Sequence, residues 1–279
     1  MNKSFTLIEI LIVIVVIGVL SAFVLVGMSS ITNSANITKS KAFSNSLRNS
    51  LLNNLVSEWK LNGNANDSWG TNNGAWSGPI GSNTTANWRP ESECVSGQCL
   101  HFDGTDDYIL TTFNPSNYLT TGSPFTISVW VYVTDKTTNR NIIATTSTPR
   151  FYLRSNDGAV GLGSVSILDC YSLDEDVWQN LVVVFTGTQI KSFVNVDIKT
   201  IKSYTGDGAF PNEAMRISIS TLPFSGLIDE LSIYNKELLI SRIEQNYFIG
   251  LNELYKNKTI TQVEYLERIA ELKYNLVKQ

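Results

Sequence analysis

The side chains able to carry out chemistry in this sequence are carboxylates and amides, because histidine is nearly absent. His101 is the only histidine among 279 residues, which excludes sites with several histidine ligands and most catalysis by a serine or cysteine with a histidine base. Oxygen ligands are better represented. Asn62, Asn64 and Asp67 lie in a loop rich in glycine and asparagine, which can direct several oxygens towards a calcium ion.

Asp229 is the second candidate ligand, since its expected surroundings are apolar. With the two-residue period of a strand, it shares a face with Leu227, Leu231 and Ile233. A carboxylate there needs a metal, an ionic partner or hydrogen bonds. Both interpretations stay open: Asp229 binds calcium, or it caps a loop without a metal. Three other acids, in the segment FDGTDD, are interpreted as turn-forming residues: Asp103, Asp106 and Asp107.

Three tryptophans and two cysteines lie close together in the sequence. Trp69, Trp76 and Trp88 fall in a segment rich in glycine and asparagine, where rings with nearby amides can stack on sugars or serve as partly buried packing residues. Cys94 and Cys99 flank a glycine-containing turn and predict a hairpin disulfide in an exported chain. The remaining cysteine, Cys170, is predicted to be a buried thiol.

The first 28 residues predict a membrane-spanning helix. Residues 5–28 carry a single charge, Glu9, and would extend about 36 Å, against about 30 Å for a bilayer core. Lys3 before the segment orients the N-terminus towards the cytoplasm, so the rest of the chain is exported. A secretory signal peptide cleaved after Ala22 is the alternative, but a carboxylate in the apolar segment is costly and indicates a partner.

The segment FTLIEILIVIVVIGVL resembles the N-terminus of type IV pilins and pseudopilins. The resemblance implies that prepilin peptidase cleaves between Ser4 and Phe5 and that the amine of Phe5 is methylated. It also implies that Glu9 neutralises the amine of a neighbouring subunit during assembly. Ser4 stands where the family has glycine. The expected partners are therefore other pilin-like subunits, the membrane through residues 5–28, and the peptidase.

An amphipathic pattern continues this helix towards the exported part. Phe43, Leu47, Leu51 and Leu55 recur every four residues, which predicts one helix over residues 5–57 that packs its last turns on the following domain.

From residue 58 the period changes to that of short strands. Segments of alternating or continuous apolar residues are separated by turn residues, and the expected strands are Phe125–Val133, Leu181–Phe185, Ile190–Ile198, Arg216–Ser220 and Leu227–Tyr234. No helical period interrupts them, so the sheets must be antiparallel, as in a sandwich or jelly roll.

Five segments in order resemble the laminin-G-like, concanavalin A-like jelly roll: EWKLNGNANDSWGTNNGAW, LHFDGTDDYI, PFTISVWVYV, WQNLVVVFTGTQIKSFVN and GLIDELSIYNKEL. The resemblance implies two packed antiparallel sheets, often a structural calcium between the first loop and the last strand, and in some members a glycan site. It therefore selects Asp67 and Asp229, with Asn62 and Asn64, as calcium ligands.

Helical periodicity returns after Tyr234. One helix is expected to end at Gly250, and Thr261 and Glu264 form a capping box that opens a second. The fold class is thus α+β: a long N-terminal hydrophobic helix, an antiparallel β-sandwich and a short C-terminal helical segment. The expected divisions are a leader (1–4), an assembly helix (5–57), a jelly roll (58–250) and a helical segment (251–279).

Composition and motifs exclude some classes of function. The net charge of -4 without a basic run argues against nucleic acid as a partner. No strand carries the paired carboxylates of concanavalin-like hydrolases, so the chain is expected not to be an enzyme. We expect a pilin-like or pseudopilin-like subunit, anchored in the cytoplasmic membrane with its N-terminus inside, whose exported head serves filament structure, adhesion, or binding to glycans or surface proteins. The alternative is a membrane-anchored or secreted lectin-like protein outside any filament.

Overall fold

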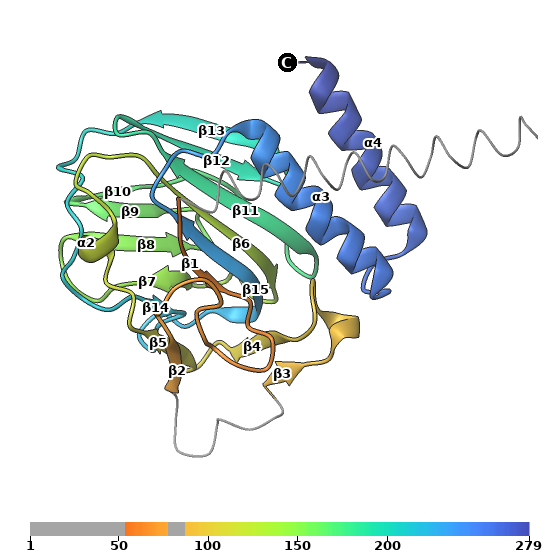
Figure 1. The fold of residues 1–279 in the computed structure, drawn as a ribbon, viewed down its shortest axis with the longest axis horizontal. Coiled ribbons are helices and arrows are strands. Elements are labelled where there is room, and N and C mark those ends of the chain that lie inside the picture. Colours follow the sequence, from red (N-terminus) through yellow and green to blue (C-terminus); the bar gives the residue numbers. More distant parts are fainter. Residues whose placement is uncertain (1–53, 78–86, 279) are drawn as a thin grey trace, which may run out of the picture. The chain divides into compact units, whose positions relative to one another are not determined.

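Alternating apolar and polar residues build the central strand β6 (Phe125–Val133) of the protein. The structure, a computed structural model, describes residues 54–77 and 87–278 (Figure 1). One face of β6, which includes Phe125, Ile127 and Val129, lies in the main core. Its neighbours β11 and β15 both run antiparallel to it. The predicted antiparallel β-sandwich is confirmed.

Two sheets form the sandwich, and we call them sheet A and sheet B. Among the described residues, sheet A has eight strands, which in spatial order are β13 (Asp197–Ser203), β12 (Gln189–Val194), β11 (Trp178–Phe185), β6, β15 (Ser225–Tyr234), β4 (Cys99–Asp103) and β3 (Trp88–Arg89), with β1 (Leu55–Trp59) pairing β15. Sheet B has seven in the same part of the chain: β10 (Val165–Ile167), β9 (Val160–Gly163), β8 (Arg150–Arg154), β7 (Asn141–Ala144), β14 (Arg216–Ile217), β5 (Tyr108–Thr111) and β2 (Gly74–Ser77).

The main core fills the space between the two sheets. Aromatic rings from both sheets and their loops meet there at centroid distances of 5.4 to 5.9 Å, with Phe125 contacting Phe151, Phe185 and Phe210. Such close-packed rings leave little freedom for the strands to shift. The sandwich therefore holds its loops on a rigid frame.

Two helices, α3 (Ile240–Lys256) and α4 (Gln262–Lys278), follow the last strand (Figure 1). They cover part of the outer face of sheet A, because Tyr247 of α3 stacks on Trp130 of β6 at 5.5 Å. Arg268 of α4 donates to the carbonyl oxygen of Trp178 at 2.9 Å.

The backbone N–H of Glu264 donates to the hydroxyl of Thr261 at 3.2 Å, so the predicted cap is present. Two shorter helical turns are α2 (Pro115–Tyr118) and η1 (Glu91–Glu93).

Four predicted element boundaries are wrong. The strand expected over Arg216–Ser220 ends at Ile217, before Ser218, whose φ is 62°. Residues 55–57, expected at the end of the N-terminal helix, lie in β1, where pairing with β15 satisfies their backbone groups. The segment Ile190–Ile198 is two strands, because Asn195 and Val196 have positive φ and form a two-residue turn between β12 and β13. Gly250 does not end α3. Its hydrogen side chain lies against the Trp130 ring, where a Cβ would fall 2.5 Å from a ring carbon.

The predicted membrane helix and the predicted assembly residues belong to the N-terminal part of the chain. Ser4, Phe5, Glu9 and the helix predicted up to residue 53 lie outside the described residues. Within the described ranges, no helix is both long enough and apolar enough to cross a membrane.

Candidate functional site

The loop that follows β1 is organised around one carboxylate, Asp67. Its Oδ1 accepts hydrogen bonds from the backbone N–H groups of Glu58, Trp69 and Gly70 at 2.8 to 3.0 Å, and its Oδ2 accepts from that of Asn72 at 3.0 Å. Burial opposes ionisation of Asp67, but these four donors outweigh it and lower the pKa below its ordinary value. The loop is thus closed by a buried, ionised carboxylate.

Trp69 projects from this fixed loop into solvent. The residue is 45% exposed, while its backbone N–H is held by Asp67. Exposed amides lie on the same loop, at Asn62, Asn64 and Asn66. The side chain of Asn64 is tied locally, since its Oδ1 accepts from the N–H of Asn66 at 2.9 Å. The arrangement is a rigidly mounted aromatic ring with polar neighbours, which suits stacking on the apolar face of a sugar.

The other two tryptophans of the sequence prediction are packing residues. Trp76 of β2 stacks on Phe102 at 6.2 Å, and Trp88 of β3 packs, partly buried, against the same core. Neither presents a free ring as Trp69 does, because the strand period turns both towards the space between the sheets.

Asp229 shares a face of β15 with Leu227, as predicted, but not with Leu231 and Ile233. A β-bulge at Glu230, whose φ is 49°, reverses the alternation, so Leu231 and Ile233 face the main core while Asp229 faces the helices. Asp229 is fully buried. Its carboxylate accepts from the backbone N–H groups of Val95, Ser96 and Glu230 at 2.9 to 3.1 Å. Burial nevertheless raises its pKa well above the ordinary value.

These contacts do not fit a calcium ion shared by Asp67 and Asp229. Calcium requires six to eight oxygens, whereas both oxygens of each carboxylate already accept backbone N–H groups. Asn62 also serves a backbone group, because its Oδ1 accepts from the N–H of Gln98 at 3.1 Å. The structure thus favours the capping interpretation of Asp229, and it places Asn64 in a turn of its own loop.

The loop that Asp229 and Asn62 hold contains the predicted disulfide. Cys94 and Cys99 are bonded, which confirms the prediction, and both are buried beneath the helices. The turn between α3 and α4 contacts the same loop, since the Thr259 hydroxyl donates to the Cys94 carbonyl at 3.0 Å. Cys170 is a buried free thiol, as predicted, and burial raises its pKa to about 11, so it is unreactive.

Acidic side chains meet in the connection between β4 and β5. One oxygen each from Asp103, Asp106 and Asp107 lies within 4.8 Å of the others, a group that could hold a metal ion. Asp107 is only 3% exposed. The sequence interpreted these acids as turn formers, and Asp103 does accept from the N–H of Thr105 at 2.8 Å.

The outer face of sheet B carries an aromatic residue that sequence reasoning missed, Tyr152 of β8. Its ring lies directly on Gly161 of β9, where a Cβ would come within 2.2 Å, and its hydroxyl donates to Ser166 of β10 at 2.6 Å. Across the sheet in the other direction, Tyr152 is paired with Ala144 of β7, and Ala144 is paired with Arg216 of β14. The pairing of tyrosine with glycine across two strands appears only once the register is known.

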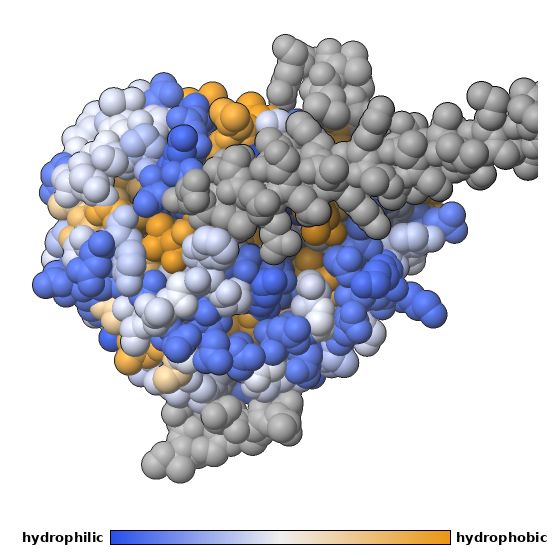
Figure 2. Space-filling model, in the orientation of Figure 1, coloured by the Kyte–Doolittle hydropathy of each residue, from blue (hydrophilic) through white to orange (hydrophobic). Residues whose placement is uncertain are grey.

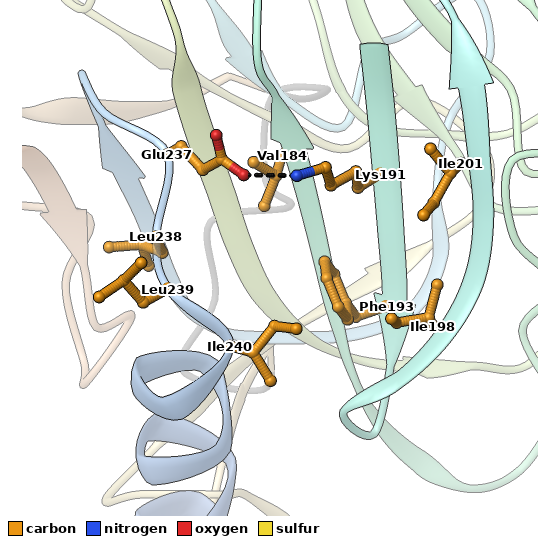
Figure 3. A pocket seen from close by; sticks show the side chains of 9 residues that line it. All are labelled: Val184, Lys191, Phe193, Ile198, Ile201, Glu237, Leu238, Leu239 and Ile240. Carbon is orange, nitrogen blue, oxygen red and sulfur yellow. Dashed lines mark hydrogen bonds and ion pairs between the residues drawn. The ribbon is translucent and has the colours of Figure 1, made fainter. Parts of the chain in front are cut away.

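One hollow on the described part of the chain is mainly apolar. It encloses about 400 Å³ beside the start of α3 and is crossed on one side by the ion pair of Lys191 and Glu237 at 2.7 Å (Figure 3). Its other lining residues are Val184, Phe193, Ile198, Ile201, Leu238, Leu239 and Ile240. On the face shown in Figure 2, hydrophobic surface forms patches separated by hydrophilic side chains. The two charged side chains that line it, Lys191 and Glu237, are paired with each other, and the other lining residues are apolar.

The two packed antiparallel sheets define a jelly-roll fold, and the sequence comparison gives its family. Residues 103–244, half of the chain, match the concanavalin A-like lectin/glucanases superfamily, and the chain belongs to this family. Residues 1–25 match the prokaryotic N-terminal methylation motif, which confirms the resemblance to pilins and pseudopilins. No curated protein matches the chain.

Solved structures share the fold at low sequence identity. The chain is similar to domain 4 of AbnA, an extracellular arabinanase from Geobacillus stearothermophilus solved with arabinotriose, at 19% identity and a TM-score of 0.56, covering 69% of this chain and 97% of that one. It is also similar to the binding domain of Paraclostridial Mosquitocidal Protein 1, at 16% identity and a TM-score of 0.54 over 72% of this chain and 53% of that one. The botulinum neurotoxin serotype D binding domain gives 15% identity, a TM-score of 0.54, and coverage of 72% and 52%. The chain thus spans about half of each toxin domain.

Proposed function

We propose that the chain is a pilin-like subunit whose exported head binds glycans. The observation that carries the glycan part is the loop at Asp67, where four backbone hydrogen bonds to one buried carboxylate fix an exposed tryptophan ring. A ring that is rigid before binding loses little conformational entropy when a sugar stacks on it. The arabinotriose bound to domain 4 of AbnA supports a sugar as the ligand class.

A glycan screen with the full chain, purified in detergent, tests this proposal. We expect binding to a subset of glycans by the wild-type chain and its loss in Trp69→Ala, since loss of one stacking ring costs about 1 to 2 kcal/mol and weakens binding by about 5- to 30-fold.

Tyr152→Ala is the matched control, because it removes an aromatic ring from the outer face of sheet B. Unchanged binding in Trp69→Ala together with loss in Tyr152→Ala would move the glycan site to sheet B. No binding to any glycan by the wild-type chain would contradict the proposed function.

The assembly part of the proposal rests on the N-terminal motif. We propose that prepilin peptidase cleaves between Ser4 and Phe5, that residues 5–28 anchor the subunit in the membrane, and that Glu9 pairs with the amine of a neighbouring subunit. The match of residues 1–25 to the methylation motif supports each step. N-terminal mass spectrometry of the mature chain is expected to find Phe5 first and methylated.

Filament incorporation separates this proposal from its alternative, an anchored or secreted lectin outside any filament. Glu9→Ala should leave a folded, membrane-inserted protein that is absent from purified filaments, while Glu91→Ala, on the head, should be incorporated normally. Absence of the wild-type chain from filaments, with glycan binding intact, would favour the alternative. We further propose that the head binds without hydrolysis, so that products should not accumulate from any bound glycan.

A further inference from the structure

We propose that the connection between β4 and β5 binds one calcium ion through Asp103, Asp106 and Asp107. This loop joins the two sheets, because β4 belongs to sheet A and β5 to sheet B. It therefore lies at the rim where the layers of the sandwich meet. The proposal is independent of glycan binding and of assembly.

The three carboxylates converge more closely than their charges alone would favour. One oxygen of each lies within 4.8 Å of the other two. At such distances like charges repel strongly in a partly buried loop. Gly104, with a φ of 79°, makes the tight turn that brings Asp103 back towards Asp107, and the N–H of Asp103 donates to Oδ2 of Asp107 at 3.3 Å.

A second observation points to a ligand, namely an unsatisfied oxygen on Asp107. The residue is only 3% exposed, and its Oδ1 has no hydrogen-bond donor among the residues that the structure describes. A buried carboxylate oxygen without a partner costs free energy unless a cation or proton occupies it.

The cations near the loop are engaged elsewhere. Arg140 reaches the carbonyl oxygen of Gly104 at 3.0 Å, but its ion pair is with Asp135. His101 lies within β4 itself, and burial lowers its pKa below the ordinary value. Among the described residues, no ion pair to the three acids is formed.

The donor set selects calcium among common metal ions. All three side chains offer hard oxygen ligands, which exclude a preference for zinc or copper. Calcium accepts irregular shells of six to eight oxygens, with carbonyls and water completing the set, whereas magnesium requires a nearly ideal octahedron. An ion bound here would link sheet A to sheet B and so would raise the resistance of the sandwich to unfolding.

Thermal unfolding of the full chain in detergent, in chelator and in calcium, tests the proposal. At calcium one hundred times its dissociation constant, the Tm should rise by about 5 to 10 °C. Asp107→Asn and Asp106→Asn should each remove most of this rise. Asp106 is only half-buried, so Asp106→Asn is expected to fold even if Asp107→Asn does not. The test therefore stays decisive. Asp176→Asn, an exposed carboxylate on another turn, should retain the full rise.

Terbium, a luminescent substitute for calcium, gives a second measurement. Tyr108 follows Asp107 directly, so excitation of tyrosine should sensitise terbium emission in the wild-type chain, and calcium should suppress it by competition. An equal Tm in chelator and calcium would overturn the proposal, as would a calcium-dependent rise that persists in both Asp106→Asn and Asp107→Asn. An equal rise with magnesium would contradict the choice of calcium.

Discussion

Replacing Asp67 by asparagine tests whether this carboxylate closes its loop without a metal. The isosteric amide would keep one oxygen for the three donors now at Oδ1 and would turn its own N–H₂ group towards the N–H of Asn72. One backbone donor would lose its acceptor, at a cost of about 1 to 3 kcal/mol, and three bonds would change from a charged to a neutral acceptor.

We therefore expect Asp67→Asn to lower the free energy of unfolding by about 3 kcal/mol. For a domain of 150 to 250 residues, this is a fall in Tm of about 6 to 12 °C. The assay is thermal unfolding of the full chain in detergent, followed by near-UV circular dichroism, in chelator and in calcium. The cost should be equal in both, because backbone N–H groups and not an ion satisfy the carboxylate. Asp176→Asn is the control and should change the Tm by less than about 2 °C.

The pH dependence of this cost follows from the direction of the pKa. Because the pKa of Asp67 is lowered in the folded state, its contribution is present above the unfolded value of 3.8 and is lost as the pH falls through the folded value. The difference between wild type and Asp67→Asn should thus shrink in acid. A Tm within about 2 °C of wild type at pH 7, or a cost seen only in calcium, would refute the reasoning.

Three further predictions concern the helices, the disulfide and the second buried carboxylate. Gly250→Ala should lower stability by about 1 to 3 kcal/mol in thermal unfolding, because its Cβ would meet the Trp130 ring, whereas Ile249→Ala on the exposed side should have little effect. The paired change Cys94→Ala and Cys99→Ala should cost about 2 kcal/mol in urea unfolding, and reducing agent should no longer affect that variant. Since the pKa of Asp229 is raised, its contribution is present below pH 3.8 and declines as the pH rises through the folded value, so the wild-type advantage over Asp229→Asn should be greatest in acid.

The sequence allowed the fold to be predicted because its main signals are local. The alternation in β6 and the continuous apolar run in β11 indicate buried antiparallel strands whatever lies around them. The hydroxyl of Thr261 and the cysteine pair likewise act within a few residues. Elements of this kind need no tertiary information.

The errors arose where tertiary contacts override a local pattern. Leu55 continues a helical stripe, yet it forms a strand because β1 pairs with the end of β15 that lies beyond its pairing with β4. Gly250 looks like a helix end, but the ring of Trp130 requires its small size. The bulge at Glu230 places Asp229 and Leu231 on opposite faces of β15. The segment LIDELSIY contains no residue type that predicts such a bulge.

The candidate site was predicted in part for the same reason. Trp69 and Asp67 were found because a loop rich in asparagine and glycine with an exposed aromatic residue is a local feature. The sequence did not predict that Asp67 fixes the backbone that carries Trp69, because Asp67 binds backbone groups on both sides of the loop. The Tyr152 surface depends on register across β8 and β9, and the unsatisfied oxygen of Asp107 depends on burial.

The affinity of the head for one glycan from the screen, measured on wild type, Trp69→Ala and Trp69→Phe, tests the central claim most directly. Phenylalanine keeps a stacking ring, so we expect Trp69→Phe to retain most of the affinity and Trp69→Ala to lose it by about 5- to 30-fold, with the Tm unchanged in both. Equal affinities for the wild-type chain and Trp69→Ala would contradict the account of this loop as the glycan-binding site.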